Sequence, residues 1–284
     1  MTDTMTETGI RQVMGVVPGV DAQDGAGVKL KRSLGGPRLQ LFDPFLLLDE
    51  FCSDKAGDYI AGFPDHPHRG FETVTYMLAG RMRHRDNQGN SGLLLPGGAQ
   101  WMTAGRGIVH SEMPEQEDGL MWGFQLWVNL PSGSKMTAPR YQDIDPSDIP
   151  EVTRENGTKI RVVAGEADGV KGAVSDIAVK PLYLDVTLPA GEVFSQPVPQ
   201  GHNAFIYVFG GSLKIGETVA GNGDMALLTE GGQVEAAALA GENARFLLIA
   251  GEPIGEPVAR YGPFVMNTKE EIMQAFQDYQ SGKF

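Results

Sequence analysis

Short apolar runs rich in valine, isoleucine, leucine, phenylalanine and tyrosine recur along the chain, and turn residues separate them. Among these runs are ETVTYML, MWGFQLWVNL, KIRVVAG, LYLDVTLP, AFIYVFGG and RFLLIAG. The chain has 38 glycines and 18 prolines spread between them, and RDNQGN at residues 85–90 joins two runs like a hairpin loop. Runs of this length and spacing are typical of β-barrels and β-sandwiches. The pattern therefore predicts an all-β fold.

Only the C-terminal end has a helical pattern. Thr268 and Glu271 stand at the N-cap and N3 positions of a capping box, which marks a helix start. The apolar residues that follow at helical spacing are Ile272, Met273, Phe276 and Tyr279. We expect one short helix that packs this apolar face on a sheet.

A polar, proline-rich segment divides the predicted strands into two groups. We expect an N-terminal domain over residues 1–135, a linker over 136–158 and a C-terminal domain over 159–284 that ends in the helix. The halves also resemble each other, because PHRGFETVTYMLAGRM in the first has a counterpart in GHNAFIYVFGGSLKIG in the second. A duplicated β-barrel unit would explain both.

Charge and cysteine content exclude some classes of function. The chain has 36 acidic residues against 23 lysines and arginines, a net charge of −13 that a nucleic-acid backbone would repel. A single cysteine excludes an intrachain disulfide and favours a reducing compartment. The N-terminus has no secretory pattern, and no apolar run has the roughly 18 residues of a membrane span. We expect a cytoplasmic protein that binds neither membranes nor nucleic acid.

Three of the five histidines are gathered in two short motifs. His66 and His68 belong to DHPHRGFETVTYML, and His110 precedes Glu112 in GRGIVHSEMP. Residues two apart in a strand point to the same face, so each pair would project together. Two such pairs on neighbouring strands would offer three imidazoles and one carboxylate to a single ion. The sequence therefore predicts one metal site, in the N-terminal domain.

The other two histidines have less specific surroundings. His84 lies between Arg83 and Arg85 before a turn, and we expect it to be exposed. His202 is interpreted as the remnant of a histidine pair in the second half, because the residues after it offer no ligand two positions on. The C-terminal domain is therefore expected to hold no metal.

Several long motifs resemble those of the pirin family in the cupin superfamily. They are HPHRGFETVTY, HRDNQGNSG, QWMTAGRGIVHSE, DGAGVKLKR, DPFLLLDEF and GPFVMNTKEEI, which together extend over nearly the whole chain. The resemblance implies a bicupin, with two double-stranded β-helix (jelly-roll) domains and one metal, usually iron, in the first. The family's ligands fall on His66, His68, His110 and Glu112. In many other cupins the glutamate ligand follows the histidine pair closely, which here would be Glu72.

The resemblance also implies a chemistry. Three imidazoles and a carboxylate suit Fe(II) and could hold Zn, Mn, Co, Ni or Cu, leaving about two positions for substrate and O2. Some pirins open quercetin as a 2,3-dioxygenase, and Glu112 or Glu72 would then be the general base. We expect aromatic and apolar walls for the flat substrate, from Phe71, Trp101, Met102 and Trp122.

Two other functions fit the same resemblance. Some pirins are regulators that bind a transcription factor or a metabolic enzyme, so the protein could be a redox- or metal-dependent regulator without turnover. The fold would also accommodate another small-molecule oxygenase or an isomerase.

Overall fold

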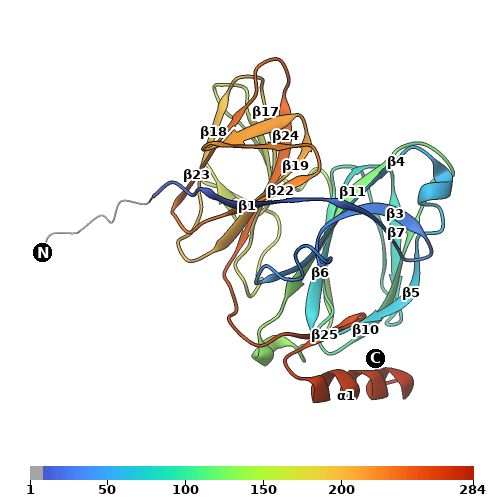
Figure 1. Ribbon diagram of the computed structural model, residues 1–284. Helices are drawn as coiled ribbons and strands as arrows, with labels where there is room; N and C mark the ends of the chain where they lie inside the picture. Colours follow the sequence, from blue (N-terminus) through green and yellow to red (C-terminus); the bar gives the residue numbers. More distant parts are fainter. Residues whose placement is uncertain (1–8) are drawn as a thin grey trace, which may run out of the picture. The chain divides into compact units, whose positions relative to one another are not determined.

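The computed structural model describes residues 9–284, and strands dominate this part of the chain (Figure 1). The predicted all-β class is confirmed. Within residues 9–284 the α-helices are limited to α1 (Lys269–Gln280), and no helix there is long and apolar enough to cross a membrane. The chain divides into two compact units. The first contains 19–149, 176–179 and 254–284, and the second contains the described residues up to Pro18, 150–175 and 180–253.

The first unit contains two sheets that place the predicted metal ligands. The larger has the strand order β12-β9-β6-β11-β4-β3-β2 and the smaller the order β5-β10-β7-β8. The strands of this unit are β2 (Val20–Asp24), β3 (Val28–Leu34), β4 (Phe45–Ser53), β5 (Phe63–His68), β6 (Phe71–Ala79), β7 (Met82–Asp86), β8 (Ser91–Leu94), β9 (Ala99–Thr103), β10 (Ile108–Pro114), β11 (Met121–Asn129), β12 (Arg140–Ile144), β25 (Ala259–Tyr261) and β26 (Phe264–Met266). Short 3-10 turns lie at Ala56–Asp58 and Ser132–Ser134.

The strands β5 and β6 belong to different sheets, and a tight turn at residues 69–70 connects them. Gly70 in this turn has a φ of 87°, and a side chain there would overlap the carbonyl oxygen of Val265. The backbone N–H of Val265 also donates to the carbonyl of Arg69 at 3.0 Å. Glycine is required because the turn needs both a left-handed backbone and space for its neighbour.

The second unit repeats the two-sheet arrangement. Its larger sheet has the order β1-β22-β19-β24-β17-β14-β13 and its smaller sheet the order β18-β23-β20-β21. Its strands are β1 (Val13–Pro18), β13 (Glu151–Thr153), β14 (Lys159–Ala164), β15 (Glu166–Ala167), β16 (Val170–Lys171), β17 (Leu182–Leu188), β18 (Val193–Pro197), β19 (Asn203–Gly210), β20 (Ser212–Ile215), β21 (Thr218–Gly221), β22 (Asp224–Leu228), β23 (Gln233–Ala238) and β24 (Ala244–Gly251).

Apolar side chains form the core of the second unit. Phe194 and Phe246 meet edge to face with centroids 5.2 Å apart inside a large cluster of buried residues from most of its strands. His202 belongs to the same unit, and its backbone carbonyl accepts a hydrogen bond from Arg11 at 2.8 Å. Among the described residues of this unit no group of three potential metal ligands comes together.

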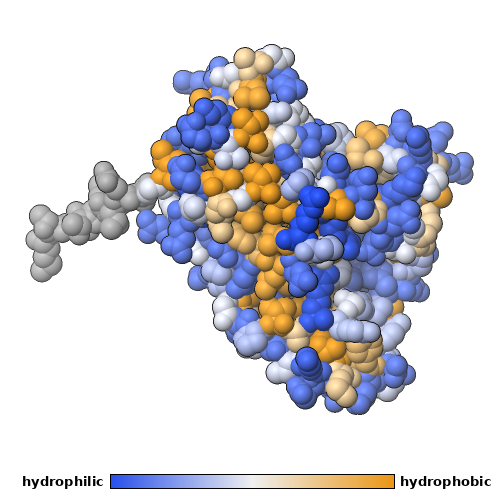
Figure 2. Space-filling model, in the orientation of Figure 1, coloured by the Kyte–Doolittle hydropathy of each residue, from blue (hydrophilic) through white to orange (hydrophobic). Residues whose placement is uncertain are grey.

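The face in Figure 2 shows hydrophobic residues interspersed with hydrophilic ones.

The units differ from the predicted domain boundaries in three places. The predicted linker at 136–158 contains β12, which pairs with β9, and β13, which pairs with β14. The strand β1 pairs with β22 of the second unit, and residues 254–284 belong to the first. Backbone pairing along sheet edges decides these memberships, and it leaves little trace in the side-chain pattern.

The C-terminal helix begins where the sequence predicts it. The Thr268 hydroxyl accepts from the N–H of Glu271 at 3.2 Å, and the Glu271 carboxylate accepts from the N–H of Thr268 at 2.9 Å. The buried face is narrower than predicted. Ile272 and Ala275 are buried, and the partly buried Phe276 meets Phe264 with ring centroids 4.8 Å apart. By contrast, 63% of Met273 is exposed.

Candidate metal centre

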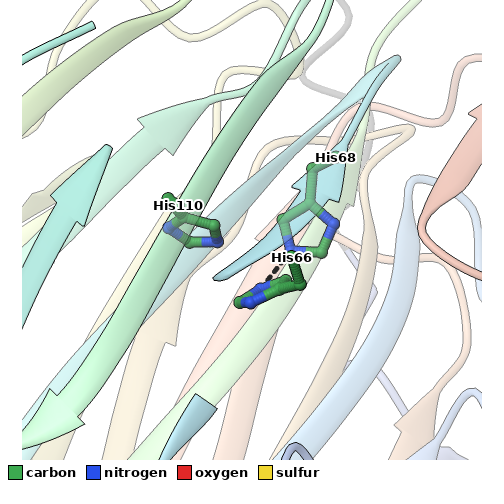
Figure 3. A group of neighbouring side chains, drawn as sticks. All are labelled: His66, His68 and His110. Carbon is green, nitrogen blue, oxygen red and sulfur yellow. Dashed lines mark hydrogen bonds between the residues drawn. The ribbon is translucent and has the colours of Figure 1, made fainter. Parts of the chain in front are cut away.

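Two antiparallel strands bring the three predicted histidines together. His66 and His68 lie on β5, His110 lies on the adjacent β10, and the register pairs His110 directly with His66. One ring nitrogen from each lies within 4.8 Å of the others (Figure 3). The centroid of the His110 ring is 4.4 Å from that of the His66 ring and 5.1 Å from that of the His68 ring. The group therefore has the spacing of a three-imidazole metal site.

The protonation of these rings suits a cation. Burial holds the pKa of His110 and of His68 well below the ordinary value, and the neighbouring histidines lower it further. Both rings are therefore neutral at pH 7. Within residues 9–284, neither ring nitrogen of His110 has a hydrogen-bond partner. A buried ring with two unsatisfied nitrogens is costly unless a ligand engages it. These residues therefore fit a metal ion.

His66 is oriented by its own strand. Its Nδ1 lies 2.8 Å from the carbonyl oxygen of Pro64, which can only accept, so Nδ1 carries the hydrogen. This tautomer leaves Nε2 with a free lone pair, and that atom faces Nε2 of His68 at 3.0 Å. A backbone carbonyl that fixes the ring of a metal-binding histidine is a common arrangement.

Glu112 is buried beside the histidines but outside the three-histidine group. The pairing of β10 with β5 shifts by one residue between His110 and Glu112, which lies opposite Phe63. The Thr75 hydroxyl donates to Oε1 of Glu112 at 2.8 Å. Thr75 also lies 2.7 Å from the Gln125 side-chain amide, which in its flipped orientation donates to Thr75. Glu112 as a metal ligand therefore remains a prediction.

Glu72 faces away from the histidines. Alternate residues of β6 point to opposite faces, so Glu72 and Thr75 lie on different sides of the large sheet. The Glu72 carboxylate accepts from Trp101 Nε1 at 3.0 Å and from the Thr103 hydroxyl at 2.6 Å, and burial raises its pKa. The turn before β6 interrupts the strand, so Glu72 does not share the face of His68 although it lies four residues further along the chain.

His84 is buried, so its predicted exposure is wrong. It points inward from β7, only 1% of it is accessible, and its ring stacks on that of Tyr141 with centroids 5.0 Å apart. Its Nε2 lies 3.1 Å from a carboxylate oxygen of Asp143. The flanking arginines misled the interpretation, because alternate strand residues face opposite sides.

A cavity of about 590 Å³ lies against the histidines. Its wall includes His66, His68 and Glu112. The apolar residues that line it are Ala26, Leu30, Leu47, Phe51, Phe63, Pro64, Pro67, Trp127 and Pro263. Trp127 meets His68 edge to face, with centroids 5.2 Å apart. The size and lining are those of a site for a small organic molecule.

The predicted wall residues lie elsewhere. Trp101 bonds Glu72 on the far face of the large sheet, and Trp122 Nε1 donates to Glu50 at 2.8 Å. Phe71 packs behind the site against His68, with centroids 5.0 Å apart, and Met102 is buried with other apolar residues. Trp127 was missed because nearly every position of β11 is apolar, which hides the alternation.

Two aspartates that line the cavity, Asp24 and Asp49, form a charged layer with Arg32. Arg32 donates to both oxygens of Asp49 at 2.8 and 2.6 Å, and to Asp24 at 2.6 Å. Burial raises the pKa of Asp49 to about 6, although the bonds from Arg32 act against this rise. Arg32 thus has both of these carboxylates as direct partners.

Comparisons with known proteins agree on the family. The chain matches the family models "Pirin" over residues 27–128 and "Pirin C-terminal cupin domain" over residues 183–284. It is 52% identical to a pirin-like protein of Caulobacter vibrioides, covering 97% of this chain and 99% of that one. It is 47% identical to pirin of Mus musculus, covering 93% and 90%.

A solved structure agrees with the fold. A crystal structure of quercetin 2,3-dioxygenase from Acinetobacter baumannii is 37% identical, with a TM-score of 0.88, over 97% of this chain and 99% of that chain. The predicted bicupin architecture is confirmed. With both family models matched and a three-histidine group inside the first of them, the chain belongs to the pirin family.

Proposed function

We propose that this protein is a metal-dependent dioxygenase that cleaves quercetin-type flavonols with O2. The observation that supports it most is the three-histidine group beside an apolar cavity. The similarity to a structure named quercetin 2,3-dioxygenase gives further support. Iron is the proposed metal, since imidazole and carboxylate ligands with open positions suit Fe(II) oxygenase chemistry.

The residues of the cavity have separate tasks in this proposal. His66, His68 and His110 would hold the metal, with Glu112 as a fourth ligand. When bound, the metal would supply a Lewis-acid and redox centre for a hydroxy-ketone and O2. Phe63 and the other apolar walls would hold the flat ring system and exclude water.

Glu112 is the proposed general base. Thr75 binds one of its oxygens, and the second would accept the proton of a flavonol hydroxyl once it swings free of the metal. Glu72, the other candidate from the sequence, is withdrawn from this role because its carboxylate is bonded to Trp101 and Thr103 on the opposite face of the sheet.

Oxygen uptake with quercetin tests this function. Iron-loaded protein should consume O2 and remove the flavonol absorbance. His68→Ala should lose this activity but keep a cooperative thermal unfolding transition, which shows that the variant is folded. His202→Ala is the matched control, because it removes a histidine from the second unit and should retain activity. Quercetin that stays intact with iron-loaded protein under air would refute the dioxygenase.

The alternative is a metal- or redox-dependent regulator without turnover. It predicts a protein partner that is retained from native extract and released when the iron is oxidised. The oxygen-uptake experiment separates the two functions, because only the enzyme consumes O2 in proportion to substrate.

A further inference from the structure

Arg260 is an exposed residue that lines the cavity and lies against an aromatic ring. Its guanidinium carbon lies 4.7 Å from the ring centroid of Trp127, and Nη1 donates to the carbonyl of Leu46 at 2.9 Å. Stacking on an aromatic face and one hydrogen bond fix the plane of the guanidinium. Since Trp127 also touches His68, Arg260 is one aromatic ring away from the histidine group.

The charge of Arg260 has no direct counterion. The neighbouring Arg32 contacts both Asp49 and Asp24, whereas across residues 9–284 no carboxylate forms an ion pair with Arg260. A guanidinium has five N–H donors, and the Leu46 carbonyl takes one. The remaining donors are available at a cavity whose lining combines apolar residues with the carboxylates of Asp24, Asp49, Asp65 and Glu112.

We propose that Arg260 is a specificity-determining residue that binds an anionic oxygen, a carboxylate or an ionised phenol, on an aromatic ligand of this cavity. The ligand's chelating oxygens would lie at the histidines, its rings along Trp127 and its anionic group at Arg260. This inference deepens the proposed function and rests on it, because it takes the cavity as the substrate site.

Arg260 has a competing explanation as a distant counterion for the layer of Asp24 and Asp49. Burial and the nearby Arg32 lower the pKa of Arg260, and both carboxylates act against this shift, so their fields reach it. That explanation gives Arg260 a role in stability and none in ligand choice. The two therefore differ in whether a variant changes the preference between a charged and a neutral ligand of the same shape.

Binding of two matched ligand pairs tests the proposal. The probes are 3-hydroxyflavones with a carboxylate or its isosteric carboxamide at the 4′ or the 7 position, titrated into nickel-loaded and metal-free protein. For at least one position the carboxylate should bind about tenfold more tightly than the amide, the usual margin of a charge-assisted hydrogen bond. The preference should persist without metal.

Variants assign this preference to Arg260. Arg260→Gln should abolish it, Arg260→Lys should keep part of it, and Lys214→Gln, with the same change of net charge in the second unit, should leave it intact. A preference that survives Arg260→Gln in protein with an unchanged melting temperature would overturn the inference. So would equal binding, or no binding, of both members of each pair to the wild type.

Turnover is measured separately, so the two proposals fail separately. Charge preference without consumption of 3-hydroxyflavone by iron-loaded protein would refute the dioxygenase and leave Arg260 as an anion-binding residue. Turnover without charge preference would do the reverse.

Discussion

Lys135 is a buried cation whose hydrogen-bond partners are neutral oxygens. Its titration therefore tests how burial changes the pKa of a lysine in this protein. Its Nζ donates to the carbonyl of Gly70 at 2.8 Å, to the side chain of Asn129 at 2.7 Å and to the carbonyl of Val265 at 3.1 Å. Burial lowers the pKa of Lys135 from 10.5 to about 8. The folded protein therefore releases this proton at a lower pH than the unfolded chain does.

The sign of the pH dependence follows from linkage. Between pH 8 and 10.5 the unfolded state binds more protons at Lys135, so the free energy of unfolding should rise with pH there. Each pH unit inside the window contributes about 1.4 kcal/mol, which gives roughly 3 kcal/mol across it. Below pH 8 Lys135 is protonated in both states, so the free energy of unfolding no longer changes with pH through this group.

Lys135→Met removes the titration while keeping an unbranched side chain of similar length. At neutral pH the variant loses three hydrogen bonds and also the cost of a buried charge, which oppose each other. The pH-dependent part is free of this ambiguity. Wild type should therefore gain about 2 to 3 kcal/mol over the variant as pH rises from 8 to 10.

Urea unfolding of both proteins at several pH values between 7 and 10 measures this difference. Lys214→Met, at an exposed lysine of the second unit, controls for the general effect of losing a cation. A wild-type advantage that stays constant over this range, or that shrinks, would refute the assigned burial of the charge.

Three further predictions concern the site, its turn and the helix. His110→Ala should lower the metal retained per chain at least tenfold, measured by elemental analysis after dialysis, while the far-ultraviolet circular dichroism stays unchanged. Gly70→Ala should cost more than about 2 kcal/mol, because it adds overlap with Val265 to a strained backbone, whereas Gly89→Ala has a similar φ in open space and should cost only about 1. Thr268→Ala should cost about 1 kcal/mol in thermal unfolding, and retention of full stability would exclude a working cap.

The sequence predicts the histidine group well because strand geometry is local. A separation of two residues places His66 and His68 on one face whatever the rest of the fold does. Pairing with the strand of His110 was then the simplest way to complete a site. The helix start at Thr268 is equally local, since a capping box involves only four residues.

Other features depend on backbone geometry that the pattern of side chains does not record. The turn at Gly70 interrupts strand parity, so Glu72 points away from the site. Burial of His84 depends on which face of β7 turns inward, and its arginine neighbours gave the opposite indication. Trp127 belongs to a strand in which both faces are apolar, so the sequence pattern does not indicate which face points toward the site.

The strand β5 lies at the edge of its sheet, and this position has a consequence for metal exchange. An edge strand opens locally at a lower free-energy cost than a strand paired on both sides. Two of the three imidazoles belong to this edge, whereas His110 belongs to β10, which has neighbours on both sides. Fraying of one ribbon would thus detach two ligands together and leave the third in place. An ion could then enter or leave a protein that remains folded, at a rate that global stability does not set.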